Sequence, residues 1–273
     1  MEIGLFYNNG NNRSGPGKLA GNLTKGLSLA GANVSHNRVC EYTGCLQPTN
    51  FDALPDNALI GPNIMVLPNE YPMLWKRFKN HVVPCDWVKN KYKSFPETDG
   101  LDLNIWSVGI DTDLFSVDKN PEIDYLIYYK NRDIEIMRDI KRKLDPMGLT
   151  YTAIAYGNYN EEQFLKLLAK CKGCIVASGT ESQGIAYMEM LSTNTPCYVL
   201  DKTVWDDRPG CSFQATSAPY FTDECGIKYT DLSRFEEFNK EINNYSPRDY
   251  ILREHTLLKS AEKYIKLLEN SHD

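Results

Sequence analysis

Residues 171–200 read CKGCIVASGTESQGIAYMEMLSTNTPCYVL, and their pattern indicates the fold class. An apolar, partly β-branched run at Cys174–Ala177 predicts a buried strand that ends in a turn. A helix is expected to begin near Gly184, and the apolar run Cys197–Leu200 predicts the next strand. Strand, helix and strand in this order favour a parallel sheet with helices on both faces.

The start of this helix is a candidate anion site. The first amides of a helix have no intrahelical acceptor, and the helix dipole adds partial positive charge there, which suits a diphosphate. Glu181, at the turn, can accept hydrogen bonds from sugar hydroxyls, and Glu189, about two turns into the helix, from ribose hydroxyls. The other predicted contacts with a nucleotide are Ser182, Gln183, Gly184 and Ile185.

Glu181 and Glu189 form an E-x7-E pattern, and residues 190–196, MLSTNTP, follow it. This pattern resembles the nucleotide-binding element of the retaining glycosyltransferases of the B fold (GT-B), such as those of glycosyltransferase family 4. Met190 stands where that family usually has alanine, and Asn194 where it usually has glycine. Asparagine tolerates a left-handed backbone, so it can follow a helix end as glycine does.

Two more segments carry the resemblance. Residues 108–115, VGIDTDLF, resemble the G-[IV]-D-x-x-x-F segment that ends the first domain in that family. His81–Cys85 and the helical pattern Asp86–Tyr92 resemble the strand and helix that precede it, with His81 itself expected in the core or at a strand edge. The resemblance implies an α/β fold of two Rossmann-like domains with parallel sheets and a cleft between them.

Asp, Lys, Asn and Pro cluster between Phe115 and Ile123, and this cluster predicts a domain boundary. We expect an N-terminal, acceptor-side domain over residues 1–118 and a C-terminal domain that binds the nucleotide sugar over residues 119–273. In the family the last helix often crosses back to the first domain. Residues 63–67, NIMVL, predict a buried strand within the first domain.

Transfer from a nucleotide sugar expels a nucleoside diphosphate, and preorganised cations lower that barrier by stabilising the growing charge. In the family an arginine and a lysine do this without a metal. Lys130 and Arg132, just after the strand predicted at 125–129, are the candidates here, and alternate positions of an extended segment share a side. Arg138 is a poorer candidate because the pattern places it on a helix surface.

Residues 9–17, NGNNRSGPG, form a glycine-rich loop after the first predicted strand. The resemblance implies that Gly15 and Gly17 let the backbone approach the diphosphate and the acceptor closely. A Walker A loop does not fit, because Asn12 stands where its first glycine should be and Leu19 where Ser or Thr should hold magnesium.

A dinucleotide fingerprint is the second interpretation of this loop. Gly15, Gly17 and Gly21 open a predicted helix, and Glu41 follows at a distance compatible with a ribose contact. This pattern would indicate an NAD(P)-dependent oxidoreductase.

Composition limits the other possibilities. The 273 residues suffice for two modest domains, and the 42% apolar content is ordinary for a packed core. No segment approaches the roughly 20 apolar residues of a membrane span, and the N-terminus lacks a signal peptide, so we expect a cytoplasmic protein. The net charge of −6 argues against a nucleic-acid partner.

The eight cysteines do not predict a metal site. Cys171 and Cys174 form a C-x-x-C pair, but the other cysteines and the four histidines do not supply a second pair at zinc spacing. We expect buried or partly buried free thiols in a reducing compartment.

These observations converge on one expected reaction. The resemblance implies transfer of a sugar from a nucleoside-diphosphate sugar to a glycan, lipid or other hydroxyl acceptor, with retention of configuration and without metal or cofactor. Glu181, Lys130 and Arg132 are the expected catalytic residues. Besides the oxidoreductase, a catalytically degenerate module that binds a sugar nucleotide stays open, since the first domain is short and the basic motif is altered.

Overall fold

The structure is a computed structural model, and it describes residues 1–8, 14–47 and 51–271. The chain divides into two compact units: unit 1 comprises residues 1–109 and 254–273, and unit 2 comprises residues 110–253. The division lies at Gly109–Ile110 rather than at residue 118.

The segment before residue 118 belongs to unit 2 because its backbone is bound there. Arg248 donates from Nη1 to the carbonyl oxygen of Phe115 at 3.1 Å and from Nη2 to that of Thr112 at 3.2 Å. The Ser192 hydroxyl also donates to the Phe115 carbonyl at 2.9 Å.

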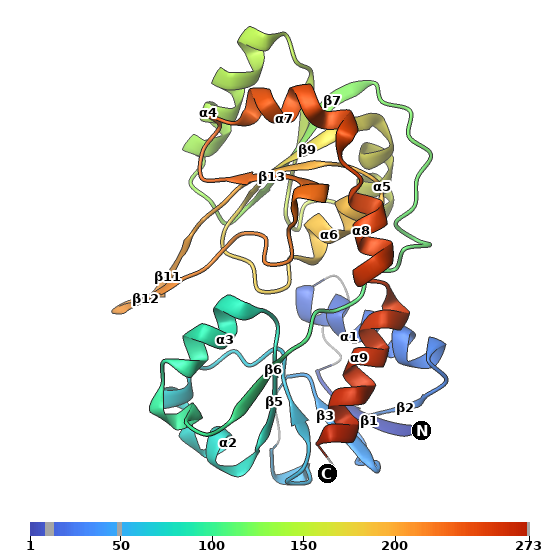
Figure 1. The fold of residues 1–273 in the computed structure, drawn as a ribbon, viewed down its shortest axis with the longest axis vertical. Helices are drawn as coiled ribbons and strands as arrows, with labels where there is room; N and C mark the ends of the chain where they lie inside the picture. Colours follow the sequence, from blue (N-terminus) through green and yellow to red (C-terminus); the bar gives the residue numbers. More distant parts are fainter. Residues whose placement is uncertain (9–13, 48–50, 272–273) are drawn as a thin grey trace. The chain divides into compact units, whose positions relative to one another are not determined.

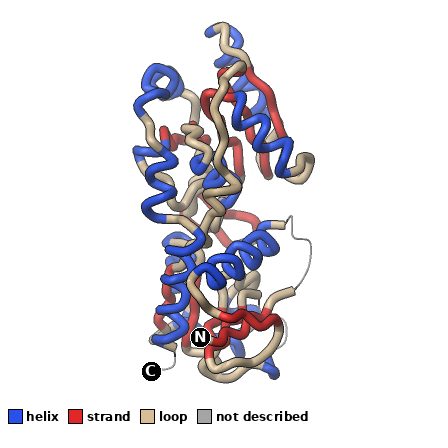
Figure 2. Tube along the Cα trace, turned by 90° about the vertical axis from the view of Figure 1, so that its right-hand side faces the viewer, coloured by secondary structure: helices blue, strands red, loops and turns tan. Residues whose placement is uncertain are grey.

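Unit 1 contains a six-stranded parallel sheet in the order β2-β1-β3-β4-β5-β6 (Figure 1). Its strands are β1 (Glu2–Phe6), β2 (Asn33–His36), β3 (Tyr42–Cys45), β4 (Leu59–Ile60), β5 (Asn80–Val83) and β6 (Asp102–Ile105). Its α-helices are α1 (Gly15–Leu29), α2 (Pro72–Arg77), α3 (Asp86–Lys93) and α9 (Leu257–Asn270). Helices accompany the strands in both units (Figure 2).

Helix α9, from the end of the chain, packs against α1 within unit 1. Gly26 permits this close approach, since a Cβ added there would lie 2.5 Å from the carbonyl oxygen of Leu257 and 3.0 Å from the Cβ of Ala261. The last helix is therefore part of the unit that the N-terminus begins.

The strand predicted at residues 63–67 is absent from the described structure, where Met65 is 68% exposed. The strand lies earlier, at β4, and ends at Ile60. Gly61 has a left-handed φ of +110° and Pro62 lacks an N–H, so the ladder cannot continue through them. The apolar pattern was correct about burial at Ile64 and Leu67 but wrong about the backbone.

His81 lies on β5 in the core of unit 1, as expected. Its side chain is fully buried and its ring stacks on Trp75 with centroids 4.5 Å apart. Burial lowers the pKa of His81 from its usual 6.5 to about 4.

This buried histidine makes stability depend on pH. Between about pH 6.5 and pH 4 the unfolded chain binds a proton at His81 that the folded chain does not, so the free energy of unfolding falls as pH falls through this window. His81→Phe keeps a ring on Trp75. Between pH 7 and pH 5 we expect its free energy of unfolding to fall by about 2 kcal/mol less than that of the natural protein. Urea unfolding at both pH values measures this, and an identical pH dependence in the two proteins would contradict it.

Unit 2 contains a five-stranded parallel sheet in the order β13-β10-β9-β7-β8. Its strands are β7 (Ile123–Lys130), β8 (Tyr151–Ala155), β9 (Cys171–Ser178), β10 (Cys197–Leu200) and β13 (Gly226–Tyr229). Its α-helices are α4 (Glu135–Leu144), α5 (Glu161–Lys170), α6 (Ile185–Ser192), α7 (Phe235–Glu241) and α8 (Pro247–Glu254, whose last residue falls in unit 1). The antiparallel strands β11 (Val204–Arg208) and β12 (Cys211–Gln214) form a hairpin that extends away from this sheet (Figure 1).

The two faces of the unit 2 sheet bury different helices. Alternate strand residues, among them Tyr125, Ile127 and Tyr198, form one core with side chains of α4 and α7. The intervening residues face α5 and α6, which pack against β7, β9 and β10. At the carboxyl edge this second set ends with Lys130 on β7 and its register partner Ser178 on β9.

None of the described helices combines the length and apolar composition of a membrane-spanning segment. All eight cysteines fall within the described residues and are free thiols, six of them buried, which confirms that part of the sequence prediction.

Candidate functional site

Helix α6 begins at Ile185, which confirms the helix start expected near Gly184. Gly184 is the N-cap residue and has a left-handed φ of +64°. A Cβ added there would lie 2.0 Å from the ring of Tyr187, a residue only 2% exposed. Glycine also has no side chain to accept from the first amides of the helix, which leaves this end suited to an anion.

Glu181 lies just before α6 in the chain and pairs with Lys130 of β7. Lys130 Nζ lies 2.8 Å from Glu181 Oε1, and the Ser178 hydroxyl donates to the same oxygen at 2.6 Å. The two charged side chains are only 20% and 15% exposed, so solvent screens this ion pair less than it screens a surface pair. The Lys130 ammonium also lies 4.4 Å from the ring centroid of Tyr156, which follows β8.

The turn that carries Glu181 is held by backbone contacts on both sides. Gly179 N–H donates to the Lys130 carbonyl at 2.8 Å, and Glu181 N–H donates to the Thr216 carbonyl at 2.9 Å. The Ser217 hydroxyl donates to the Ser178 carbonyl at 3.0 Å. The carboxylate position is therefore set by β7, β9 and the segment that follows β12.

Arg132 contacts other groups than Lys130 does. Asn131 has a left-handed φ of +50°, so the extended geometry ends at Lys130 and the expectation that positions 130 and 132 share a side is wrong. Arg132 Nη1 instead reaches the carbonyl oxygens of Ser178 and Leu200, at 3.4 Å each. Its side chain lines a depression of about 650 Å³ to which Lys130 does not contribute.

Glu189 lies within α6 and is 2% exposed. Burial raises the pKa of Tyr159, and the charge of Glu189 raises it further. The assignment of Glu189 to a ribose stays a prediction.

Gln183, another residue predicted to contact the nucleotide, is held by an aromatic neighbour. Gln183 is 7% exposed, and the Tyr220 hydroxyl donates to its Oε1 at 3.4 Å. Tyr220 N–H donates to the Tyr187 hydroxyl at 3.2 Å, which links the segment after β12 to α6. Ser182 is half-buried and Ile185 is 8% exposed.

Two residues near this edge, Lys228 and Tyr156, were not predicted from the sequence. Lys228, on β13, donates from Nζ to the Ala218 carbonyl at 3.1 Å and to the Thr216 hydroxyl at 3.3 Å. Tyr156 contributes the ring beside Lys130. Tyr156 directly follows β8, so its place at a strand end was a usable signal, whereas nothing near Lys228 in the sequence resembles a ligand motif.

Gly15 and Gly17 lie in unit 1, in the first turn of α1 rather than in a loop. The Ser14 hydroxyl caps this helix by accepting from the Gly17 N–H at 3.2 Å. The preceding part of the glycine-rich loop, residues 9–13, lies outside the described residues. Their proposed contact with a diphosphate stays a prediction.

The dinucleotide interpretation does not fit unit 1. Glu41 directly precedes β3, at the amino end of a strand that runs parallel to β1. A ribose contact in such a fold comes from the carboxyl edge of the sheet. Glu41 is therefore at the wrong edge.

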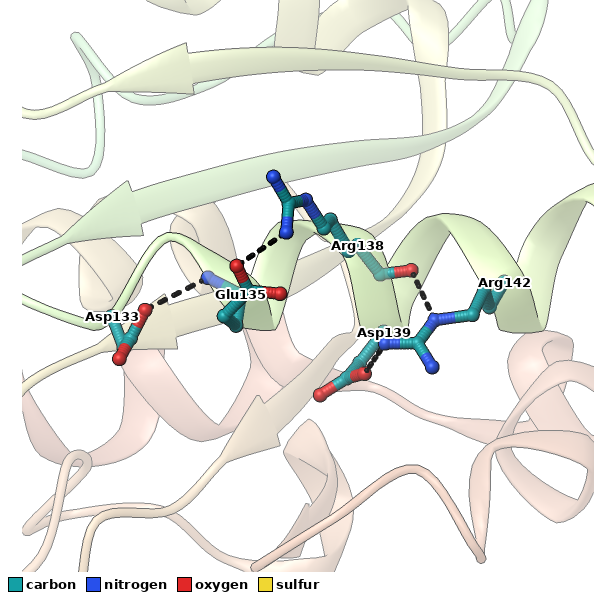
Figure 3. A network of polar contacts seen from close by, with 5 residues as sticks. All are labelled: Asp133, Glu135, Arg138, Asp139 and Arg142. Atoms are coloured by element: carbon teal, nitrogen blue, oxygen red, sulfur yellow. Dashed lines mark hydrogen bonds and ion pairs between the residues drawn. The ribbon is translucent and has the colours of Figure 1, made fainter.

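Arg138 is a surface residue of α4, as expected. It donates from Nη1 to Glu135 at 2.5 Å and is 71% exposed. Figure 3 shows this pair together with the Asp139–Arg142 pair and with Asp133, whose Oδ1 accepts from the Glu135 N–H at 3.0 Å. These contacts stabilise the helix, and they explain the exposed charges without a ligand.

No protein-family model matches the chain, and no curated protein matches its sequence. Solved structures do match its fold. The sucrose-phosphate synthase of Thermosynechococcus elongatus superposes with a TM-score of 0.60 at 10% identity, over 99% of this chain and 98% of that one. WaaG, a glycosyltransferase involved in lipopolysaccharide biosynthesis, superposes with a TM-score of 0.50 at 10% identity, over 99% and 98%. The chain therefore has the α/β fold of GT-B glycosyltransferases, with two Rossmann-like units that each contain a parallel sheet.

Proposed function

We propose that this protein is a glycosyltransferase that moves a sugar from a nucleoside-diphosphate sugar to a hydroxyl acceptor, with retention of configuration. The observation that carries the proposal is the Lys130–Glu181–Ser178 contact directly before the N-terminus of α6. At one sheet edge, the cation and the helix N-terminus suit the diphosphate of such a donor, and the carboxylate suits its sugar hydroxyls. The fold shared with two glycosyltransferase structures supports the same reaction class.

In this proposal the diphosphate lies at the first amides of α6, where the helix dipole favours negative charge. Lys130 stabilises the charge that grows on the departing diphosphate, so no metal or cofactor is assigned to this step. One oxygen of Glu181 is held by Lys130 and Ser178, and the carboxylate accepts hydrogen bonds from the sugar hydroxyls. Glu189 accepts from the ribose. The acceptor is a glycan, a lipid or another hydroxyl compound, and the free thiols favour a reducing compartment such as the cytoplasm.

Calorimetric titration with UDP, GDP and ADP, each compared with its nucleoside, tests this placement. We expect at least one diphosphate to bind, and Lys130→Met to weaken that diphosphate about tenfold while changing the nucleoside little, because the lost charge faces the phosphates. Lys166→Met is the matched control, since Lys166 pairs with Glu162 on the exposed face of α5. Equal loss of nucleoside and diphosphate affinity would remove Lys130 from the phosphate site.

Turnover distinguishes an enzyme from a binding module. Release of the nucleoside diphosphate from its sugar, slowly with water and faster with an acceptor, is the expected result, and NMR of the product reports whether the anomeric configuration is kept. Tight binding without release for any acceptor would favour the degenerate module. Binding of NADH in place of the nucleotide would favour the oxidoreductase, which the position of Glu41 disfavours.

A further inference from the structure

Unit 2 has a concave region at the carboxyl edge of its sheet. The depression of about 650 Å³ is formed by the segments that directly follow β7, β10 and β13. Its volume lies within the roughly 300–1,000 Å³ of small-molecule sites, and its location is where parallel sheets bind ligands. Its lining residues are Asn131, Arg132, Asp133, Asp201, Lys202, Thr203, Val204 and Thr230.

Arg132 is incompletely paired in this depression. Within the part of the chain that the structure describes, Nη1 alone has acceptors, the two carbonyl oxygens at the long distance of 3.4 Å. Among residues 1–8, 14–47 and 51–271, Nε and Nη2 donate no hydrogen bond, although they carry three of the five guanidinium hydrogens. Partial burial lowers the pKa of Arg132, while the charge of Asp201 opposes this. A half-buried guanidinium with a free edge is suited to bidentate binding of a phosphate.

The carboxylates around Arg132 are held in fixed positions. Asp201 Oδ1 accepts from the Thr216 hydroxyl at 2.8 Å and from the Ser217 N–H at 2.6 Å, which leaves Oδ2 for another partner. Asp133 Oδ1 is occupied by the first turn of α4 (Figure 3). Fixed carboxylate oxygens accept hydrogen bonds from hydroxyl groups without a large loss of side-chain entropy.

The balance of charge decides which ligand class fits. Arg132 and Lys202 are opposed by Asp133 and Asp201, and Lys202 Nζ already lies 2.7 Å from Asp206. A free diphosphate would meet two carboxylates and one available cation, which is unfavourable. A polyol with a single phosphate satisfies both kinds of group, since its hydroxyls can donate to the carboxylates while its phosphate accepts from Arg132.

We propose that this depression binds a sugar phosphate, with the phosphate on Nε and Nη2 of Arg132 and the sugar hydroxyls on Asp201 and Thr230. The ligand is a second molecule, bound in addition to the nucleotide at α6. The site therefore goes beyond the proposed transfer reaction and does not depend on it.

Titration calorimetry of the full chain with glucose 6-phosphate and ribose 5-phosphate tests the site, with inorganic phosphate and glucose as separate arms. We expect at least one sugar phosphate to bind at least tenfold more tightly than phosphate or glucose alone. Arg132→Gln should weaken it at least tenfold, and Arg132→Lys should restore only part of the loss because the bidentate edge is gone. Arg138→Gln, on the exposed face of α4, should change nothing.

Three results would overturn the proposal. The first is that neither sugar phosphate binds at millimolar concentration. The second is that Arg132→Gln, with an unchanged melting temperature, leaves their affinity intact. The third is that UDP, GDP or ADP competes with the sugar phosphate and loses affinity in Arg132→Gln as it does in Lys130→Met, which would assign Arg132 to the nucleotide and leave the transferase proposal standing. Failure of every nucleotide to bind would instead remove the transferase proposal and leave this site intact.

Discussion

Replacement of Glu181 by glutamine is expected to lower the turnover of the sugar donor about 100-fold, which corresponds to about 2.7 kcal/mol. The carboxylate accepts from Ser178 and pairs with Lys130 at 2.8 Å. A neutral amide keeps the shape but leaves the Lys130 ammonium without its counter-ion and weakens the acceptor for sugar hydroxyls. Initial rates of nucleoside diphosphate release at saturating donor measure the effect.

A matched control separates charge loss at the site from charge loss in general. Glu162→Gln removes a carboxylate of the same type from the Lys166 pair on α5, where both side chains are at least 69% exposed. Turnover should stay within twofold of the natural protein. A double variant with Lys130→Met should cost less than the sum of the single changes, because the two residues form one contact. Full additivity of the two losses would show that this pair is not a catalytic unit.

Gly184→Ala is expected to lower the free energy of unfolding by about 3 kcal/mol and to abolish nucleotide binding. The left-handed φ of +64° costs an alanine about 1–2 kcal/mol, and the new methyl group would meet the Tyr187 ring at 2.0 Å. That ring cannot move freely, since it is 2% exposed and its hydroxyl accepts from Tyr220. Urea unfolding monitored by circular dichroism measures the change.

Gly148→Ala is the control for backbone strain alone. Gly148 also lies in unit 2 and has a φ of +67°, but a Cβ there would meet no atom within 4 Å. We expect it to cost about 1–2 kcal/mol and to leave nucleotide affinity unchanged. If both alanine variants are equally stable, the Tyr187 contact does not constrain the start of α6.

Much of unit 2 could be predicted from the sequence because its signals are local. The strand at Cys197–Leu200 is found with the bounds that its apolar pattern indicated, and α6 begins one residue after Gly184. Apolar periodicity and a polar cap such as Asn160, whose side chain accepts from the Gln163 N–H at 2.8 Å, are set by nearby residues. The same reasoning failed for the β11–β12 hairpin, whose polar residues carry no strong strand pattern.

The strand, turn and helix that carry Glu181 and Gly184 could be predicted from the sequence alone, since neighbouring residues specify each of these elements. Tertiary contacts, in contrast, set which cation pairs with Glu181 and which one lines the depression. That choice depends on Asn131, where one left-handed residue at the end of β7 separates Lys130 from Arg132. Its effect appears only when β7 lies beside β9 and the loop after β10, because contacts between strands distant in sequence depend on sheet order and register, which local patterns do not encode.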